Sequence, residues 1–237
     1  MFEEMLSGTY CGTPLNPSEL WLRWNLDPVL LLMLAVMAVA LRRSPSGRLA
    51  VAALAVAFVS PLCALSASLF SARVVHHVLL IAVAAPLLAV AVPARRSVSA
   101  TTAFLLSTLV LWAWHLPAAY DLALSNMAVY WIMQATLVAT AIVFWQTAIR
   151  PGHPQGQGLL LILAGYMQMA LLGALLTFAP EPLYTIHAVA PLDWGFTPLG
   201  DQQLGGLIMW VPAAVPFMVV GAVLACRQWR GLTRMQA

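Results

Sequence analysis

The chain has 237 residues, of which 62% are hydrophobic and only 8% are charged. Soluble domains carry about 25% charged residues, so this composition excludes an ordinary soluble domain and predicts a membrane protein with several spans. The net charge of +3 comes without a basic face or an aromatic platform, which excludes nucleic acid as a partner and leaves the lipid bilayer.

The first 20 residues are polar and do not form a cleavable signal peptide. They contain Glu3 and Glu4, are interrupted by Pro14 and Pro17, and lack both a basic start and an apolar stretch. We therefore expect residues 1–20 to remain as a tail on the outer side of the membrane.

Seven apolar segments follow the tail, and each is predicted to span the membrane as a helix. They are residues 27–41, 49–70, 73–92, 99–114, 127–149, 158–179 and 204–226. Because no internal repeat or long linker divides them, residues 21–230 are predicted to form one all-α bundle of seven transmembrane helices, followed by a tail at 231–237. The prolines inside these segments, Pro61, Pro86, Pro212 and Pro216, are expected to kink their helices. Gly206 should let the last helix approach a neighbour closely.

The arginines determine the predicted orientation. All eleven basic residues are arginine, and nine lie in alternate connections or at the C-terminal end: Arg42, Arg43, Arg48, Arg95, Arg96, Arg150, Arg227, Arg230 and Arg234. The other side has only Arg23 and Arg73, together with all eight acidic residues. The positive-inside rule therefore places the N-terminus outside and the C-terminus in the cytoplasm.

Three cysteines occur, Cys11, Cys63 and Cys226. None belongs to a C-x-x-C motif, and their spacing indicates no disulfide framework. We expect Cys63 and Cys226 to be small apolar residues packed within helices, and Cys11, in the polar tail, to meet water.

Adjacent histidines, His76 and His77, lie about one helical turn below the predicted outer surface. His115 ends the fourth segment at the same face, whereas His153 is predicted on the cytoplasmic side. Imidazoles in a span usually face a protein interior or a cavity, so these residues are either buried hydrogen-bonding groups or ligands of a metal or haem. Neighbouring residues diverge by about 100° around a helix, so at most one of His76 and His77 should point at the bundle centre.

Other polar and aromatic residues have simpler interpretations. Asp201 and Gln202 precede the last apolar segment and could cap its helix. Gln134 and Gln168 lie nearer the middle of the bilayer and are expected to form interhelical hydrogen bonds. An aromatic belt at the membrane surface accounts for Trp112, Trp114, Tyr120, Tyr130 and Trp131.

Five stretches resemble the CtaG-type cytochrome c oxidase assembly proteins, a family of polytopic bacterial membrane proteins. They are RVVHHVLLIAVAAPLL at 73–88, WAWHLPAAYDLAL at 112–124, FW at 144–145, PLY at 182–184 and PLGDQQLGGLIMWVP at 198–212. The resemblance covers about residues 21–226. The residues that match the family's pattern are His77, His115, Asp121, Asp201 and Gln202, whereas His76 is not clearly covered. The His-x-x-Glu-His motif common in the family's fifth helix is replaced here by YWIMQ at 130–134.

The resemblance implies a non-enzymatic assembly or maturation factor for a haem–copper cytochrome c oxidase in the bacterial plasma (inner) membrane, with oxidase subunits as partners. It leaves open whether the chain transfers copper, holds haem or stabilises an unfinished subunit. A haem-binding electron carrier and a permanent accessory subunit of the oxidase are the alternatives. The candidate metal ligands, for copper before haem, are His77, His115 and His76, and the polar residues expected to support them are Asp121, Asp201 and Gln202.

Overall fold

The computed structural model describes residues 10–92, 94, 98–150 and 156–236, with side chains as far as residue 230. Its α-helices are α2 (Pro28–Leu41), α3 (Pro45–Phe58), α4 (Leu62–Ser68), α5 (Phe70–Val78), α6 (Ala85–Ala91), α7 (Ala100–His115), α8 (Pro117–Ser125), α9 (Met127–Ile149), α10 (Gln157–Thr177), α11 (Pro198–Trp210) and α12 (Ala214–Gln236). Three short 3-10 helices, η1 (Pro17–Leu22), η3 (Thr185–His187) and η4 (Ala190–Trp194), and the π-helical segment η2 (Leu79–Ala84) complete the fold. The described ranges contain no β-strand, so the all-α prediction is confirmed.

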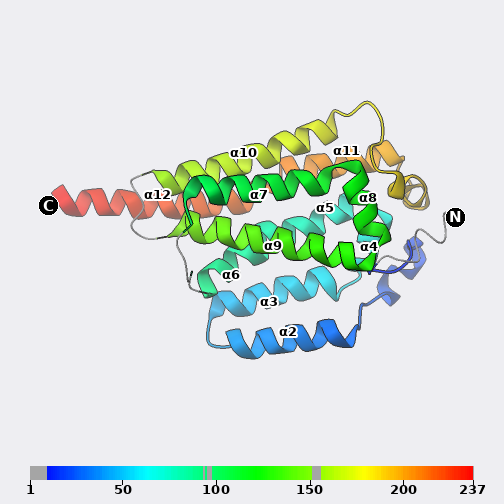
Figure 1. Ribbon diagram of the computed structural model, residues 1–237, viewed down its shortest axis with the longest axis horizontal. Helices are drawn as coiled ribbons and strands as arrows, with labels where there is room; N and C mark the ends of the chain where they lie inside the picture. Colours follow the sequence, from blue (N-terminus) through cyan, green and yellow to red (C-terminus); the bar gives the residue numbers. More distant parts are fainter. Residues whose placement is uncertain (1–9, 93, 95–97, 151–155, 237) are drawn as a thin grey trace.

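The long helices lie side by side along the longest axis of the molecule (Figure 1). One end carries η1, α4, α8, η3 and η4, whereas α12 projects from the opposite end towards the C-terminus. Every acidic residue whose structure is described belongs to the first end, which we call the acidic end: Glu19, Asp27, Asp121, Glu181, Asp193 and Asp201. The described residues therefore begin at the acidic end and finish at the opposite end of the bundle.

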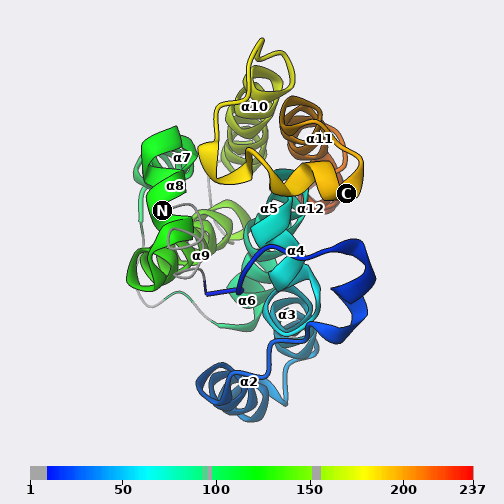
Figure 2. The same ribbon diagram turned by 90° about the vertical axis from the view of Figure 1, so that its right-hand side faces the viewer.

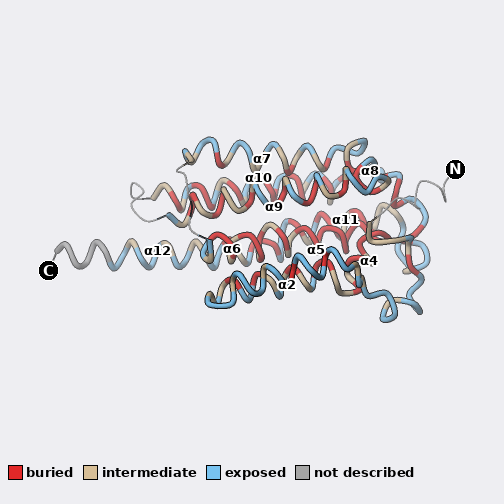
Figure 3. Tube along the Cα trace, turned by 60° about the horizontal axis from the view of Figure 1, so that its bottom comes forward, coloured by how far each residue is buried: buried red, intermediate tan, exposed pale blue. Residues whose placement is uncertain are grey.

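The continuous helix formed by α5, η2 and α6 occupies the centre of the bundle. It contacts α3, α9 and α11 and is surrounded by other helices in the end view (Figure 2). With a mean hydropathy of 2.3, this helix has half of its most apolar window buried, a larger share than in the other three long apolar helices. By contrast, α2 is peripheral and mostly exposed (Figure 3), and it buries only Leu30 and Leu34.

Four helices are long and apolar enough to cross a membrane: Phe70–Ala91, Met127–Ile149, Gln157–Thr177 and Pro198–Arg230. Two bent helix pairs, Pro45–Phe58 with Leu62–Ser68 and Ala100–His115 with Pro117–Ser125, raise the number to six if each pair is one span. The 14 residues of α2 form a shorter apolar helix. Each predicted apolar segment is therefore helical, and the chain is a membrane protein with several apolar helices.

The prolines act differently in different helices. Pro61 lies at the break between α3 and α4, which are bent by 45°, and Pro212 lies in the turn that separates α11 from α12, as predicted. Pro86 does not interrupt its helix, because it occupies the first turn of α6 directly after the π-helical segment η2. The wider turn of η2 leaves the carbonyl oxygen of Ile81 to accept a hydrogen bond from the Trp145 indole at 2.7 Å.

The expectation about cysteines was wrong in two respects. Cys11 and Cys63, 52 residues apart, form a disulfide bond at the acidic end. Cys63 is buried in α4, as expected, but Cys226 is an exposed free cysteine on α12 rather than a packed one. Sequence spacing could not reveal the disulfide, because the N-terminal segment meets α4 only after the tail folds back over the bundle.

Candidate functional site

Helix α5 begins at Phe70 without a cap of its own. Leu69 before it has an extended backbone and a side chain without an acceptor, so the first N–H groups of the helix need partners from elsewhere. Asp201 of α11, which is completely buried, accepts from the backbone N–H of Phe70 at 2.6 Å, from that of Ser71 at 3.2 Å, and from the Ser71 hydroxyl. Asp201 therefore caps α5 across the bundle and fixes the position of the residues that follow.

The interpretation of Asp201 and Gln202 as caps of their own helix was wrong. Thr197 caps α11 instead, accepting from the N–H of Gly200 at 3.0 Å. The Oε1 atom of Gln202 accepts from the N–H of Leu183 at 2.7 Å, which ties α11 to the segment after α10. Both side chains thus join separate elements of the acidic end.

Asp121 of α8 holds the loop that contains η3. Its carboxylate accepts from the Thr185 hydroxyl at 2.5 Å, from the Thr185 N–H at 3.3 Å and from the Ile186 N–H at 3.4 Å. Among the described residues, the partners of Asp121, Asp201 and Gln202 are backbone groups and hydroxyls rather than imidazoles. Their support for the histidines is therefore indirect, through the position of α5 and of this loop.

Helices α5 and α7 bring two of the predicted histidines together. The ring centres of His77 and His115 are 6.3 Å apart, and both side chains are buried. The Nδ1 atom of His115 lies 2.7 Å from the carbonyl oxygen of Leu111. Because a carbonyl oxygen only accepts, this nitrogen carries the proton, and Nε2 keeps its lone pair. The Nε2 atom of His77 is buried without a hydrogen-bond partner. Each ring thus has one nitrogen, Nε2, left to bind a ligand.

His76 points in a different direction from His77. Its ring packs edge-on against Phe58 of α3, with ring centres 4.9 Å apart, and its centre lies 5.7 Å from that of His77. Both ring nitrogens of His76 are buried without a hydrogen-bond partner. The predicted divergence of the two adjacent imidazoles is confirmed, since one lies towards α7 and the other towards α3.

Arg73 is the central residue of this region that the search for ligands missed. It is 1% exposed, and its Nε donates to the carbonyl oxygen of Ser66 at 3.1 Å, but its Nη1 has no partner. The guanidinium carbon lies 5.3 Å from the centre of the Tyr130 ring. No carboxylate among the described residues forms an ion pair with it. An arginine inside an otherwise apolar stretch was the available signal, because intramembrane charges are costly and mark functional sites.

The two glutamines behave differently. Gln168 accepts from the Trp112 indole at 2.8 Å, so its predicted interhelical hydrogen bond is confirmed. Gln134 is 2% exposed, and both atoms of its amide lack a partner, so the same prediction for this residue was wrong. Tyr120 and Tyr130 are each 1% exposed and belong to the core, not to a surface belt.

His187, in the loop between α10 and α11, is held on both ring nitrogens. Nδ1 lies 3.2 Å from the carbonyl oxygen of Ser68, so it carries the proton, and Nε2 accepts from the Tyr120 hydroxyl at 2.8 Å. Burial, with a smaller contribution from the Arg73 charge, lowers the pKa of His187 to about 3. This imidazole is therefore a neutral structural link between the loop and α4.

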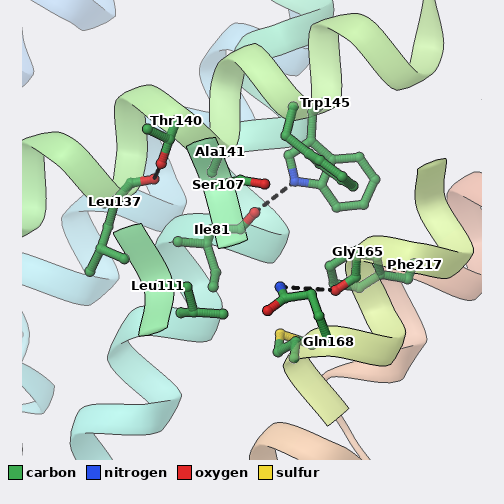
Figure 4. A pocket seen from close by; sticks show the side chains of 12 residues that line it. Ile81, Ser107, Leu111, Leu137, Thr140, Ala141, Trp145, Gly165, Gln168 and Phe217 are labelled. Carbon is green, nitrogen blue, oxygen red and sulfur yellow. Dashed lines mark hydrogen bonds between the residues drawn. The ribbon is translucent and has the colours of Figure 1, made fainter. Parts of the chain in front are cut away.

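A small cavity of about 40 Å³ lies between α7, α9, α10 and the central helix, and Figure 4 shows the side chains that line it. Two of its lining residues, Ile81 and Leu111, are one helical turn from His77 and His115, on the same helices. Its polar lining atoms are all engaged: Thr140 and Gln168 donate to backbone carbonyls at 2.8 and 3.2 Å, and Ser107 donates to the carbonyl of Phe104 at 3.0 Å. The candidate site therefore ends at the histidine pair.

Within the part of the chain that the structure describes, no three histidine, cysteine, aspartate or glutamate side chains converge as ligands for one metal ion. His153 lies outside the described residues. The acidic end thus offers His77 and His115 as a pair, with His76 beside them, rather than the four-ligand arrangement of structural zinc.

Comparison with known proteins identifies the family. Residues 35–231 match the family of cytochrome c oxidase caa3 assembly factors, a region that includes α5, α7 and the candidate histidines. Searches of curated proteins and of solved structures gave no match to this chain. Because the family match covers most of the chain, the protein belongs to the cytochrome c oxidase caa3 assembly factor family and acts in assembly of that oxidase.

Proposed function

We propose that the protein assists oxidase assembly by holding copper, as Cu(I), between His77 and His115 before its transfer. The observation that carries this proposal is the buried pair of imidazoles whose ring centres are 6.3 Å apart. Two imidazole nitrogens that each lie about 2 Å from a shared ion place their ring centres about 5 Å apart at a tetrahedral angle and about 6 Å apart when the ion and the two nitrogens are in line, and the observed separation is close to the linear value. The hydrogen bond from His115 Nδ1 to Leu111 also matches the usual support of a metal-binding imidazole, whose second nitrogen donates to a carbonyl or carboxylate.

The charge around the pair favours a monovalent ion. Arg73 precedes His77 by four residues and therefore lies on the same face of α5, where its positive charge repels a cation. A divalent ion suffers twice this repulsion, and no third protein ligand among the described residues offsets it. Imidazole ligands suit copper, and Cu(I) accepts a coordination number of two. Copper is here a cargo for the oxidase rather than a resident cofactor, and the protein itself is not an enzyme.

The acidic end faces the outer side of the plasma (inner) membrane in this proposal, with seven spans and the C-terminus in the cytoplasm. The spans are α2, α3 with α4, α5 to α6, α7 with α8, α9, α10, and α11 with α12. An odd number of spans agrees with the positions of η1 at the acidic end and of α12 at the opposite end of the bundle (Figure 1). The Cys11–Cys63 disulfide supports the same orientation, because disulfides persist in oxidising compartments outside the cytoplasm.

Reporter fusions test the orientation. Alkaline phosphatase fused after Ala237 should be inactive, and a fluorescent protein at the same position should be fluorescent, because the arginine-rich end stays in the cytoplasm. Fusions to a chain truncated after Gly195, in the loop between α10 and α11, should give the opposite pair of signals. If alkaline phosphatase fused after Ala237 were active, the orientation would be the reverse of the one proposed, and the histidine pair would lie near the cytoplasmic side.

Single substitutions test the site. His77→Ala and His115→Ala should each abolish oxidase maturation while leaving the protein at its normal abundance in the membrane. The double variant should be no worse than either single one, because residues of one site are not additive. His153→Ala, on the predicted cytoplasmic side, is the control and should have no effect. Oxidase activity, oxidase copper content and the amount of the assembly factor are the measurements.

The purified protein gives the direct readout. Wild-type protein should retain about one copper per chain after exposure to Cu(I), and either histidine variant should lose it. A Soret band without bound copper would instead assign the pair to haem. Lower abundance of the variants, together with no copper in the wild type, would make the imidazoles structural.

A further inference from the structure

The N-terminal segment Tyr10–Leu15 crosses the acidic end and covers the region around Arg73; we call it the strap. Its first part contacts α9: the Tyr10 ring stacks on Tyr130 at 5.4 Å between ring centres and meets the edge of Trp131 at 4.7 Å. The Tyr10 hydroxyl donates to the Asp27 carboxylate at 2.8 Å. Cys11 is bonded to Cys63 of α4. The first part of the strap is thus held by ring contacts, hydrogen bonds and one covalent bond.

The second part of the strap is anchored separately. Leu15 is 2% exposed, its N–H donates to the Ser68 hydroxyl at 2.7 Å, and its carbonyl oxygen accepts from the Trp194 indole at 3.0 Å. Gly12 lies between the two parts with a φ of +90°, a conformation that glycine adopts readily. Gly12 therefore turns the chain between the Tyr10–Cys11 part and the separate Leu15 anchor.

Aromatic rings separate the first part of the strap from the buried polar atoms that have no partner. Tyr130, which stacks on Tyr10, also lies 5.3 Å from the Arg73 guanidinium. Trp131 stacks on Phe58, which in turn packs against His76. Arg73 Nη1 and both nitrogens of His76 have no partner. Buried polar groups of this kind are costly unless they are satisfied. The strap packs over the rings that cover them, so these groups gain hydration or a ligand when the strap and the rings beneath it move apart.

We propose that Cys11–Cys63 is a thiol–disulfide exchange site whose reduction by a dithiol protein of the outer compartment releases the strap and exposes His76 and Arg73. Cys11 is the sulfur that is attacked, because it is partly exposed, whereas Cys63 is 1% exposed. Access of copper to the histidines through this opening rests on the function proposed above. The release of the strap on reduction does not depend on that function.

The exchange balances in two steps. A thiolate of the dithiol protein attacks Cys11 Sγ, the bond between the two cysteine sulfurs breaks, and Cys63 leaves as a thiolate. The second thiol of the dithiol protein then displaces Cys11 and closes its own disulfide. Two electrons pass to the strap disulfide, and the two protons of the dithiol end on Cys11 and Cys63. The reverse reaction closes the strap again.

The surroundings of both sulfurs suit this chemistry. The Asn25 amide nitrogen lies 3.9 Å from Cys63 Sγ, so the leaving thiolate has an N–H donor nearby. The Tyr130 hydroxyl lies 3.4 Å from Cys11 Sγ, and the Ser66 hydroxyl lies 4.0 Å from the same atom. Hydrogen-bond donors and nearby positive charge, here from Arg73 next to Tyr130, stabilise thiolates and make a disulfide easier to reduce.

Histidine acylation by diethyl pyrocarbonate, read by peptide mass spectrometry on the purified full chain, tests the proposal. In the oxidised chain, His76 should be unreactive. After treatment with reduced thioredoxin as the dithiol probe, its acylation should rise at least fivefold, and Cys11→Ser should show the same high reactivity without any reductant. His187 is the internal control: both its nitrogens are hydrogen-bonded next to the Leu15 anchor, so it should stay unreactive in all three samples.

The outcomes separate the proposal from its alternatives. Equal His76 acylation before and after reduction would overturn it, because the disulfide would then be a fixed staple or the strap would never seal the site. Joint acylation of His76 and His187 would also overturn it, since the variant or the reduced chain would then be unfolding. The measurement uses no copper, so a failure of the copper proposal leaves the acylation result unaffected.

Discussion

Alanine in place of Asp201 is expected to remove most of the folded protein from the membrane. The substitution leaves the N–H groups of Phe70 and Ser71 and the Ser71 hydroxyl without their buried acceptor. Hydrogen bonds to a charged group contribute about 1.5–3 kcal/mol each, so losing the two backbone bonds alone should cost about 3–6 kcal/mol of stability. Detergent extraction of a fluorescent fusion, followed by size-exclusion chromatography, measures the amount of folded protein.

Two matched variants show whether loss of the cap on α5 causes the drop in folded protein. Asp201→Asn keeps one carbonyl oxygen as an acceptor and should be affected less than Asp201→Ala. Asp193→Ala removes an exposed carboxylate from the same end of the bundle and should change stability by no more than about 0.5 kcal/mol. Wild-type accumulation of the Asp201→Ala variant would mean that water replaces the carboxylate at the start of α5.

The second large effect is expected at the contact between α10 and α11. A methyl group added to Gly206 would lie 2.6 Å from the carbonyl oxygen of Gly173 and 2.7 Å from the backbone nitrogen of Thr177. Backbone atoms cannot move aside, so the two helices must separate. Overpacking of this kind costs about 1–3 kcal/mol, and the larger side chain of Gly206→Leu should cost more than that of Gly206→Ala.

Thermal unfolding in detergent measures this effect. For chains of this size, each kcal/mol of lost stability lowers the Tm by about 2–4 °C. Gly221→Ala is the control on α12, because its added methyl would meet only Ile162 at an ordinary 3.8 Å. Replacing glycine by alanine in a helix raises helix propensity by about 1 kcal/mol, so the Gly221→Ala control should be neutral or stabilising. An unchanged Tm for Gly206→Leu would mean that this helix contact is not close.

The helices of this protein could be predicted from the sequence because they depend on local properties. A backbone placed in hydrocarbon must satisfy its own hydrogen bonds, so a stretch of about 20 apolar residues becomes a helix whatever its neighbours are. The predicted segments at 127–149 and 158–179 accordingly agree with α9 and α10 within two residues. The breaks at Pro61 and Pro212 follow equally locally, from a missing N–H group.

The candidate site could be predicted only in part, because only some of its features depend on local properties. Adjacent histidines in an apolar stretch must face protein rather than lipid, and their divergence follows from helix geometry, so the inward positions of His76 and His77 were foreseeable. The choice of His115 as the neighbour of His77 rested on equal depth and on the family resemblance, and the 6.3 Å separation of their rings confirms that they lie together. Copper at this pair remains a proposal.

Other features were decided by the tertiary structure alone. Asp201 caps a helix that begins about 130 residues earlier in the chain, and Cys11 meets a thiol 52 residues away. Gln134 lacks the interhelical partner that Gln168 has, although the two look alike in sequence. Composition and periodicity report whether a side chain is buried, because burial follows from the apolar pattern around it. They do not report which group it meets there, because that depends on how distant helices pack. In this protein the sequence therefore determined the helices and their inward-facing histidines, whereas packing alone determined the cap on α5, the disulfide of the strap and the unpaired charge of Arg73.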